Sequence, residues 1–127
     1  VNTCKPKSST KYDGLCLPVI ICGETVPCLI DSGAKASIMS HNTYKTLKSP
    51  LRPILKMSPQ CLRSANNGVI RTVGTAEFSM MLSDERCVQV SLIVADIESP
   101  VILGYDFLSQ HSCLLDFGPG KLFIDGI

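Results

Sequence analysis

The chain has 127 residues, of which 45% are hydrophobic and 18% are charged, and its formal net charge is +1 at pH 7. This length suits one domain with a modest core, and the composition excludes a disordered tail. A net charge so close to zero does not favour a nucleic-acid surface, and the longest nearly unbroken apolar run, residues 15–22, is too short to span a bilayer. We therefore expect neither nucleic acid nor membrane among the partners of this domain.

The N-terminal part of the chain predicts an arm followed by a hairpin. Residues 1–14 are polar and rich in proline, serine, threonine and lysine, which is typical of an arm or linker before a domain at residues 15–127. Two apolar, β-rich runs at 15–22 and 25–30 are separated by a glycine turn, so they predict two antiparallel strands. This hairpin would deliver Asp31 to a loop.

A short helix is expected after that loop. Residues 36–39 are expected to be extended, and Ser40 is well suited to cap a helix that runs to Lys48. Pro50 follows at once and would prevent the helix from continuing.

The remainder of the chain predicts short strands and one more helix. The further predicted strands, each rich in apolar or β-branched residues, are 61–64, 69–73, 75–82, 87–94, 101–103, 113–117 and 121–124. The pair Asn67-Gly68 marks a hairpin tip, and residues 105–111 predict a second short helix. Many short strands with frequent turns and one or two short helices predict a small, mostly β, barrel-like domain.

The seven cysteines argue against a metal or redox motif. They are Cys4, Cys16, Cys22, Cys28, Cys61, Cys87 and Cys113. Their number is odd, so they cannot all pair within one chain, and none has Cys-x-x-Cys spacing. Three of them, Cys16, Cys22 and Cys28, lie in apolar runs and are predicted to be small buried hydrophobes. We therefore expect a reducing compartment.

The run Leu29-Ile30-Asp31-Ser32-Gly33-Ala34 is the strongest chemical signal in the sequence. A carboxylate at the end of a buried strand has a desolvation cost that a partner or a function must offset. Gly33 allows a sharp turn, and the Ser32 hydroxyl can lock it. The same pattern also occurs in ordinary Asp-Ser-Gly turns, so this short motif does not decide the matter alone.

A second stretch, Ile102-Leu103-Gly104-Tyr105-Asp106-Phe107-Leu108, follows about seventy residues further on. The Asp31 motif, the Ala65-Asn66-Asn67-Gly68 hairpin tip and this stretch, in this order, resemble the retroviral-type aspartic proteases, the retropepsins. The resemblance spans roughly residues 15–124. It is closest to the proteases of Ty3/gypsy-type retrotransposons and to host-domesticated relatives such as the skin aspartic protease.

The resemblance implies a small closed barrel with a flap hairpin that is active as a homodimer. Peptide hydrolysis by carboxylates needs two of them side by side, one as base towards water and one as acid towards the carbonyl oxygen. The chain carries only one Asp-Ser-Gly, so the second must come from another copy, with Asp31 facing Asp31 across a two-fold axis. Two close carboxylates share a proton, so activity is expected at mildly acidic pH. No metal or organic cofactor is required.

The other roles follow from the resemblance, residue by residue. Asp31 matches the catalytic acid, and the active-site loop continues with Ser32, Gly33 and Ala34. The flap tip, a hairpin that would close over the peptide, matches Ala65, Asn66, Asn67, Gly68 and Val69. Residues expected to support the substrate pocket are Val101, Ile102, Leu103 and Gly104, with Gly104 packed behind the loop. Val69, Ile70, Val101 and Ile102 are expected to form pocket walls along an extended peptide or polyprotein substrate.

The sequence departs from the family pattern in three places. Lys35 stands where many viral members carry an acid, which bears on substrate preference. The flap has a single glycine, Gly68. The N-terminus is polar, so we expect the C-terminal hairpin, residues 113–124, to supply most of the dimer interface.

Several other reactive side chains are given structural roles. His41 and His111 are far apart with no third ligand nearby, so no metal site is expected, and Cys61 and Cys87 lack a Cys-His signature. Asp106 is interpreted as a helix N-cap or a structural hydrogen-bonding residue. Asp116 is placed in the closing hairpin and Phe107 and Leu108 in the core.

Three functions stay open at this point. The first is an aspartic endopeptidase that processes a retroelement polyprotein, in the cytoplasm or within virus-like particles. The second is a host-domesticated domain that cleaves cellular substrates or its own precursor. The third is a catalytically silent module for dimerisation or peptide binding. The intact Asp-Ser-Gly-Ala argues against this third function, because a buried acid pair costs stability and drifts away when it is unused.

Overall fold

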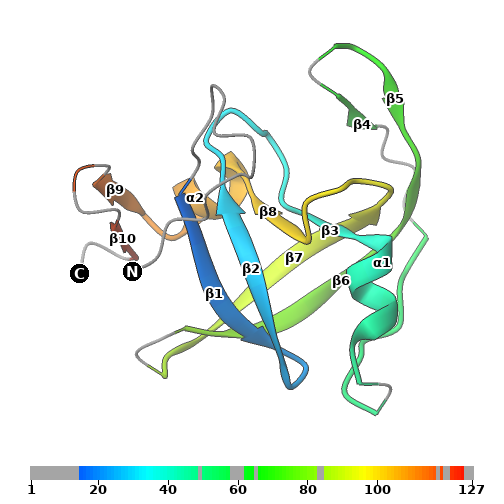
Figure 1. Ribbon diagram of the computed structural model, residues 1–127, viewed down its shortest axis with the longest axis horizontal. Helices are drawn as coiled ribbons and strands as arrows, with labels where there is room; N and C mark the ends of the chain where they lie inside the picture. Colours follow the sequence, from blue (N-terminus) through cyan, green and yellow to red (C-terminus); the bar gives the residue numbers. More distant parts are fainter. Residues whose placement is uncertain are drawn as a thin grey trace.

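The computed structural model describes residues 15–48, 50–57, 62–64, 66–82, 85–116, 118 and 121–124. Its elements are β1 (Leu15–Ile21), β2 (Glu24–Ile30), β3 (Ile38–Ser40), α1 (His41–Thr46), β4 (Leu62–Arg63), β5 (Val69–Ile70), β6 (Thr72–Met81), β7 (Cys87–Ala95), β8 (Val101–Leu103), α2 (Tyr105–Gln110), β9 (Leu114–Asp116) and β10 (Lys121–Phe123) (Figure 1). Six strands close a barrel in the order β1-β2-β8-β3-β7-β6. The predicted mostly β, closed-barrel fold with one or two short helices is therefore confirmed.

Two hairpins lie outside the barrel. β4 pairs with β5, and this hairpin stands away from the barrel above α1 (Figure 1). β9 pairs with β10 on the opposite side of the molecule, and Asp116 pairs with Lys121, so Asp116 lies in the closing hairpin as predicted. The predicted arm at residues 1–14, Cys61 and Ala65 of the hairpin tip lie outside the described residues.

Strand β2 positions the motif at residue 31. It is antiparallel to β1 over its whole length, and the turn between them falls at Cys22 and Gly23, one residue before the predicted turn, with φ of 50° and 80°. Its last three residues also pair in parallel with β8, with Ile30 opposite Leu103. Two barrel strands therefore end together immediately before Asp31.

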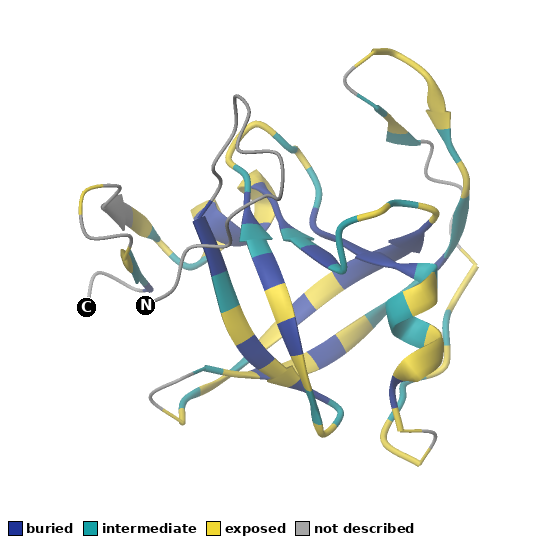
Figure 2. Cartoon of the chain, in the orientation of Figure 1, coloured by how far each residue is buried: buried dark blue, intermediate teal, exposed yellow. Residues whose placement is uncertain are grey.

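The barrel interior holds the main core. Buried and more exposed residues alternate along β2 and along the second half of β1, as the two-residue period of a strand requires (Figure 2). The largest side chains that are fully buried include Phe78, Ile21, Met39, Met80 and Leu92. Leu108 and Phe107 of α2 join this core, as predicted.

A second, smaller apolar cluster connects the loop, the barrel wall and the β4–β5 hairpin. It is centred on Ile38, Ile93 and Ala95, and its partly buried members are Ala36, Leu62, Ile70 and Ile97. This cluster brings the segment after Asp31 into contact with both strands of the hairpin and with the loop after β7.

Helix α1 begins as predicted and ends early. The Ser40 side chain accepts a hydrogen bond from the first-turn backbone N–H of Thr43, so the predicted N-cap is confirmed. The helix ends at Thr46 and does not reach Lys48. The guanidinium of Arg52 donates to the carbonyl oxygen of Tyr44, at 3.5 Å, and lies over the Tyr44 ring, which satisfies a C-terminal carbonyl and stabilises the early end.

The region around Gly74 differs from the expectation of two separate strands at residues 69–73 and 75–82. One long strand, β6, runs from Thr72 through Gly74, and a β-bulge lies between these two residues. Lys56 pairs with Thr75 in an antiparallel bridge, so its backbone lies alongside Gly74, and a Cβ at Gly74 would lie 2.7 Å from the Lys56 carbonyl oxygen. The glycine permits this close approach.

The cysteines follow the prediction only in part. Cys16 and Cys28 are buried, and burial raises the pKa of the Cys28 thiol to about 12, which makes it chemically inert. Cys22, Cys28 and Cys87 are free thiols. Cys16, however, is disulfide-bonded, which the cysteine count and spacing did not predict.

Two further observations concern the part of the chain that is described. Neither helix there is long and apolar enough to cross a membrane. No three histidine, cysteine, aspartate or glutamate side chains come together there in a group that could hold a metal ion. His41 opens α1, whereas His111 follows α2 and contacts the Phe107 ring at a centroid distance of 4.5 Å.

Candidate active site

Asp31 lies on a tight loop at the joint end of β2 and β8. Its backbone N–H donates to the Leu103 carbonyl oxygen at 3.0 Å, and its own carbonyl oxygen accepts from the Ala34 N–H at 3.1 Å. The Gly33 N–H donates to Asp31 Oδ1 at 2.9 Å, so the loop orients the carboxylate of its own first residue. Asp31 is half-buried, whereas Ser32 and Gly33 are exposed. The carboxylate is thus held at the surface, accessible to a partner or a ligand.

The N-terminus of α2 holds the loop from behind. The N–H of Tyr105 donates to the Ala34 carbonyl oxygen at 2.7 Å, and the N–H of Asp106 donates to the Lys35 carbonyl oxygen at 3.2 Å. The first N–H groups of a helix have no partner within the helix, so the loop carbonyls satisfy them. The loop is therefore fixed by backbone groups on two sides, β8 and α2.

Gly104 fits the expected place behind the loop. A Cβ on Gly104 would lie 2.6 Å from the carbonyl oxygens of both Ala34 and Ala36. These are backbone atoms on the loop, which cannot turn aside as a side chain can. The close contact between α2 and the loop therefore requires glycine at this position.

Ser37, which the sequence analysis did not single out, joins the loop to Asp106. Its hydroxyl donates to Asp106 Oδ1 at 2.7 Å and accepts from the Gly104 N–H at 2.9 Å. Its N–H donates to Asp106 Oδ2 at 3.1 Å. Only 1% of Ser37 is exposed, and a buried hydroxyl needs a hydrogen-bond partner. A serine within an apolar run was therefore the feature of the sequence that could have identified this residue.

Asp106 is a structural hydrogen-bonding residue, one of the two predicted roles. The other predicted role, that of helix N-cap, is wrong, because the N-cap of α2 is Gly104 and Asp106 lies in the first turn.

Strand β8 supports the site from inside the barrel. Val101 and Leu103 are 0% and 2% exposed and belong to the core. The expectation that Val101 walls a substrate pocket is therefore wrong for this chain, since its side chain offers no surface. Successive residues of a strand face opposite sides, so Ile102 points the other way and is half-buried.

The β4–β5 hairpin carries the residues expected to form the flap. The Ser64 N–H donates to the Gly68 carbonyl oxygen and the Asn67 N–H donates to the Ser64 carbonyl oxygen, both at 2.8 Å. Asn67 has a φ of 71°, and the Gly68 N–H donates to Ser64 Oγ and to Asn66 Oδ1, both at 3.1 Å. Val69 is 70% exposed. The tip is thus a well-bonded turn whose outer apolar side chain is exposed.

An ion pair connects the base of this hairpin to the loop after β7. Arg71 Nε donates to Asp96 Oδ2 at 2.9 Å, and the Asp96 N–H donates to the Arg71 carbonyl oxygen at the same distance. The hydrogen bond from Arg71 is the largest cause that lowers the pKa of Asp96 below its usual value. The pair therefore contributes stability above the usual pKa of aspartate, and this contribution is lost as the pH falls through the lowered value.

Replacing Arg71 by alanine is expected to raise the pKa of Asp96 towards its usual value, because the dominant hydrogen bond is lost. NMR titration of the Asp96 side-chain carboxyl carbon measures this pKa directly. Lys45→Ala is the control, since Lys45 acts on Asp96 only weakly through its charge. Equal pKa rises in the two variants would contradict the ion pair.

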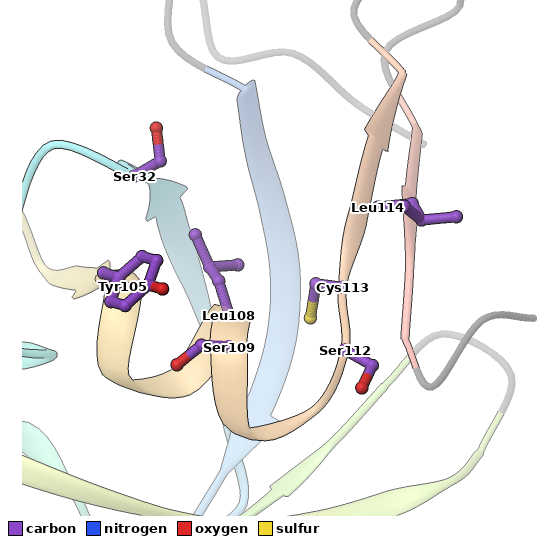
Figure 3. A pocket seen from close by; sticks show the side chains of 7 residues that line it. All are labelled: Ser32, Tyr105, Leu108, Ser109, Ser112, Cys113 and Leu114. Atoms are coloured by element: carbon purple, nitrogen blue, oxygen red, sulfur yellow. The ribbon is translucent and has the colours of Figure 1, made fainter.

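A groove lies between the active-site loop and the C-terminal segment (Figure 3). Its volume is about 360 Å³, and it is lined by Ser32, Tyr105, Leu108, Ser109, Ser112, Cys113 and Leu114. Two large side chains in it, Tyr105 and Leu114, are 60% and 61% exposed. Exposed apolar surface is thus continuous with the loop that carries Asp31.

Comparison with known proteins agrees with this geometry. Residues 17–110 match the family described as "gag-polyprotein putative aspartyl protease". The retroviral protease-like domain of Ddi1 from Leishmania major is similar in structure, with a TM-score of 0.73, 24% sequence identity and 92% of each chain covered. EIAV protease, in a complex with the inhibitor HBY-793, gives a TM-score of 0.68 and 22% identity, over 84% of this chain and 96% of that one. No curated protein matches the chain in sequence.

The two structural likenesses support the fold, and the family match covers most of the chain. The Asp-Ser-Gly loop at the end of β2 lies within the matched residues. The chain therefore belongs to the retropepsin-type aspartic protease family.

Proposed function

We propose that this chain is an aspartic endopeptidase that acts as a homodimer, with Asp31 of each copy forming the catalytic pair. The observation that carries the proposal is the position of Asp31, half-buried on a loop that β8 and α2 hold by backbone hydrogen bonds. A rigid, accessible carboxylate is half of what peptide hydrolysis by acids requires. The described residues contain one Asp-Ser-Gly loop, so a second copy supplies the other half.

The chemistry follows from bringing two such loops together. Two carboxylates in contact share one proton, because both cannot ionise cheaply at short distance. The ionised one takes a proton from a bound water, which attacks the peptide carbonyl carbon, and the protonated one donates to the carbonyl oxygen. The substrate is an extended peptide between the loop and the β4–β5 hairpin, which acts as the flap.

The groove beside Ser32 supports self-association. A two-fold axis that brings Asp31 against Asp31 must pass close to Ser32, so the surface continuous with Ser32 meets its own copy. Large exposed side chains in this groove, Tyr105 and Leu114, are what such an interface would cover. The C-terminal hairpin, to which Leu114 belongs, is then part of the interface.

Replacing Leu114 by glutamate is expected to weaken the dimer at least about tenfold, because a charge would have to be buried in an apolar contact. Sedimentation velocity over a range of protein concentrations measures the dimer constant. Met57→Glu is a matched control: Met57 is an equally apolar side chain, 92% exposed, and does not line the groove. If both variants dimerise like the parent chain, the groove is not the interface.

The substrate that we favour is the polyprotein of a retroelement. A host-domesticated domain with cellular substrates is the second candidate, and a silent binding module is the third. Cleavage of a peptide library between about pH 4 and pH 7, at high protein concentration, tests the enzymatic proposal. Cleavage strongest at mildly acidic pH supports the shared proton, whereas no cleavage by a chain shown to be dimeric would favour the silent module.

A further inference from the structure

We propose that Ser37 and Asp106 are positioning residues for Asp31, and that their hydrogen bonds form a latch that sets the orientation of the active-site loop. This inference rests on the proposed function. Neither side chain acts on the peptide in this proposal. The latch consists of the Ser37 hydroxyl, the Ser37 N–H, the Asp106 carboxylate and the Gly104 N–H.

Ser37 closes the loop at the end opposite to Asp31. At the Asp31 end, the backbone N–H binds the Leu103 carbonyl oxygen of β8. At the other end, the Ser37 carbonyl oxygen accepts from the Ile93 N–H of β7 at 3.1 Å, which ties this residue to the barrel wall. The loop of residues 31–37 is thus suspended between two barrel strands. The position of the loop relative to the barrel therefore depends on the contacts that its middle residues make.

The Ser37 hydroxyl is used in both directions. It donates to Asp106 and accepts from Gly104, so one buried oxygen joins the loop to two successive features, the end of β8 and the first turn of α2. Removal of this hydroxyl would leave the Gly104 N–H, a buried donor, without its acceptor. The hydroxyl therefore holds the loop against the element that also carries Tyr105.

Asp106 supplies the matching acceptor. Its Oδ2 accepts from the Ser37 N–H, and its Oδ1 accepts from the Ser37 hydroxyl and from the Phe107 N–H at 2.6 Å. The Asp106 N–H meanwhile donates to the Lys35 carbonyl oxygen. One residue of α2 therefore holds the loop at two points, through its backbone at residue 35 and through its carboxylate at residue 37.

In this proposal the latch acts on catalysis through the position of Asp31. Ser37 is only 1% exposed, so loss of its hydroxyl also costs some stability, and the test below therefore measures folding separately from kcat. A shift of about 1 Å in a reacting group can lower a rate by about a hundredfold. In the proposed dimer the same latch acts twice, because both carboxylates stand on identical loops.

The test compares Ser37→Ala, Ser37→Thr and Ser79→Ala. Threonine keeps a hydroxyl at position 37, and Ser79 is an exposed serine of β6 whose hydroxyl accepts a hydrogen bond from Gln89. We expect Ser37→Ala to lower kcat by about tenfold to a hundredfold with KM changed less than about twofold. Ser37→Thr should restore most of kcat, and Ser79→Ala should leave it unchanged.

Amide hydrogen exchange gives a readout that does not depend on activity. We expect faster exchange at residues 31–35 in Ser37→Ala, with unchanged exchange in β6 and β7 and an unchanged dimer constant. Asp106→Asn provides a second variant. Its amide can still accept from the Ser37 hydroxyl, but its NH₂ group cannot accept from the Ser37 N–H, so an intermediate loss of kcat is expected.

The outcomes separate this proposal from the proposed function. No cleavage by the parent chain overturns the proposed function. A parent chain that cleaves, together with a Ser37→Ala variant of parental kcat, overturns the latch. Exchange that quickens throughout the barrel, with kcat lost equally in Ser37→Thr, also overturns it, because that result describes a structural role only. If Ser37→Ala does not fold, parental kcat in Asp106→Asn overturns the latch.

Discussion

Replacing Asp31 by asparagine is expected to lower kcat for peptide cleavage by at least about a thousandfold, because the variant pair can neither take a proton from water nor share one. Asparagine keeps the size of the side chain, and its oxygen can still accept from the Gly33 N–H, so the loop should keep its shape. The measurement is the initial rate of cleavage of one identified peptide at the pH of maximal activity. Dimerisation of the variant should be unchanged.

Glu77→Gln is a suitable control for the loss of one carboxylate. Glu77 is an exposed acid on β6, and it accepts a hydrogen bond from Ser91 at 3.3 Å, away from the loop. A mixing experiment then tests whether two copies contribute to one site. An excess of the Asp31→Asn chain should suppress the parent's activity by forming mixed dimers. If the cleavage rate depends only on the amount of parent chain and not on the added variant, each chain works alone, which would contradict the paired mechanism.

The parts of the fold that depend on local signals could be predicted. The β1–β2 hairpin and the Ser40 cap each rest on residues within a few positions of one another, and both formed as expected, with the turn of the hairpin one residue earlier than predicted. The loop at Asp31 was also accessible to prediction, since an acid directly after a buried strand is conspicuous in the sequence. The closed order of the barrel strands agrees with the family that this loop and the Ile102-Leu103-Gly104 stretch indicate.

What could not be predicted depends on contacts between distant residues. Ser37 and Asp106 are 69 positions apart, and neither residue type identifies the other as its partner. Glycine is needed at position 74 because the backbone of Lys56 lies directly beside β6 there, and no local sequence pattern indicates this contact. Val101 was assigned to a pocket wall because a short apolar strand does not reveal which of its faces is inside. The pairing of β8 with β2 and β3 decides that face.

Replacing Gly104 by alanine is expected to destabilise the folded chain by at least about 3 kcal/mol, at the upper end of the usual cost of overpacking. The new Cβ would lie 2.6 Å from the carbonyl oxygens of Ala34 and Ala36, and it would displace the loop that carries Asp31. Relief would require the Tyr105 hydrogen bond to Ala34 to break as well. Urea unfolding followed by circular dichroism measures the change in the free energy of unfolding.

Gly68→Ala separates this steric effect from the ordinary cost of replacing a glycine. Gly68 lies at the tip of the β4–β5 hairpin, where a Cβ would meet only the side-chain oxygens of Asn66 and Ser64, both at 3.2 Å. These side chains can move, so the expected cost is below about 1 kcal/mol. Similar losses in the two variants would mean that the contact between α2 and the loop tolerates a methyl group. Gly104 would then not determine how closely the active-site loop packs against α2. The hydrogen bonds of Tyr105 and Asp106 to the loop carbonyls would have to hold Asp31 in place without it.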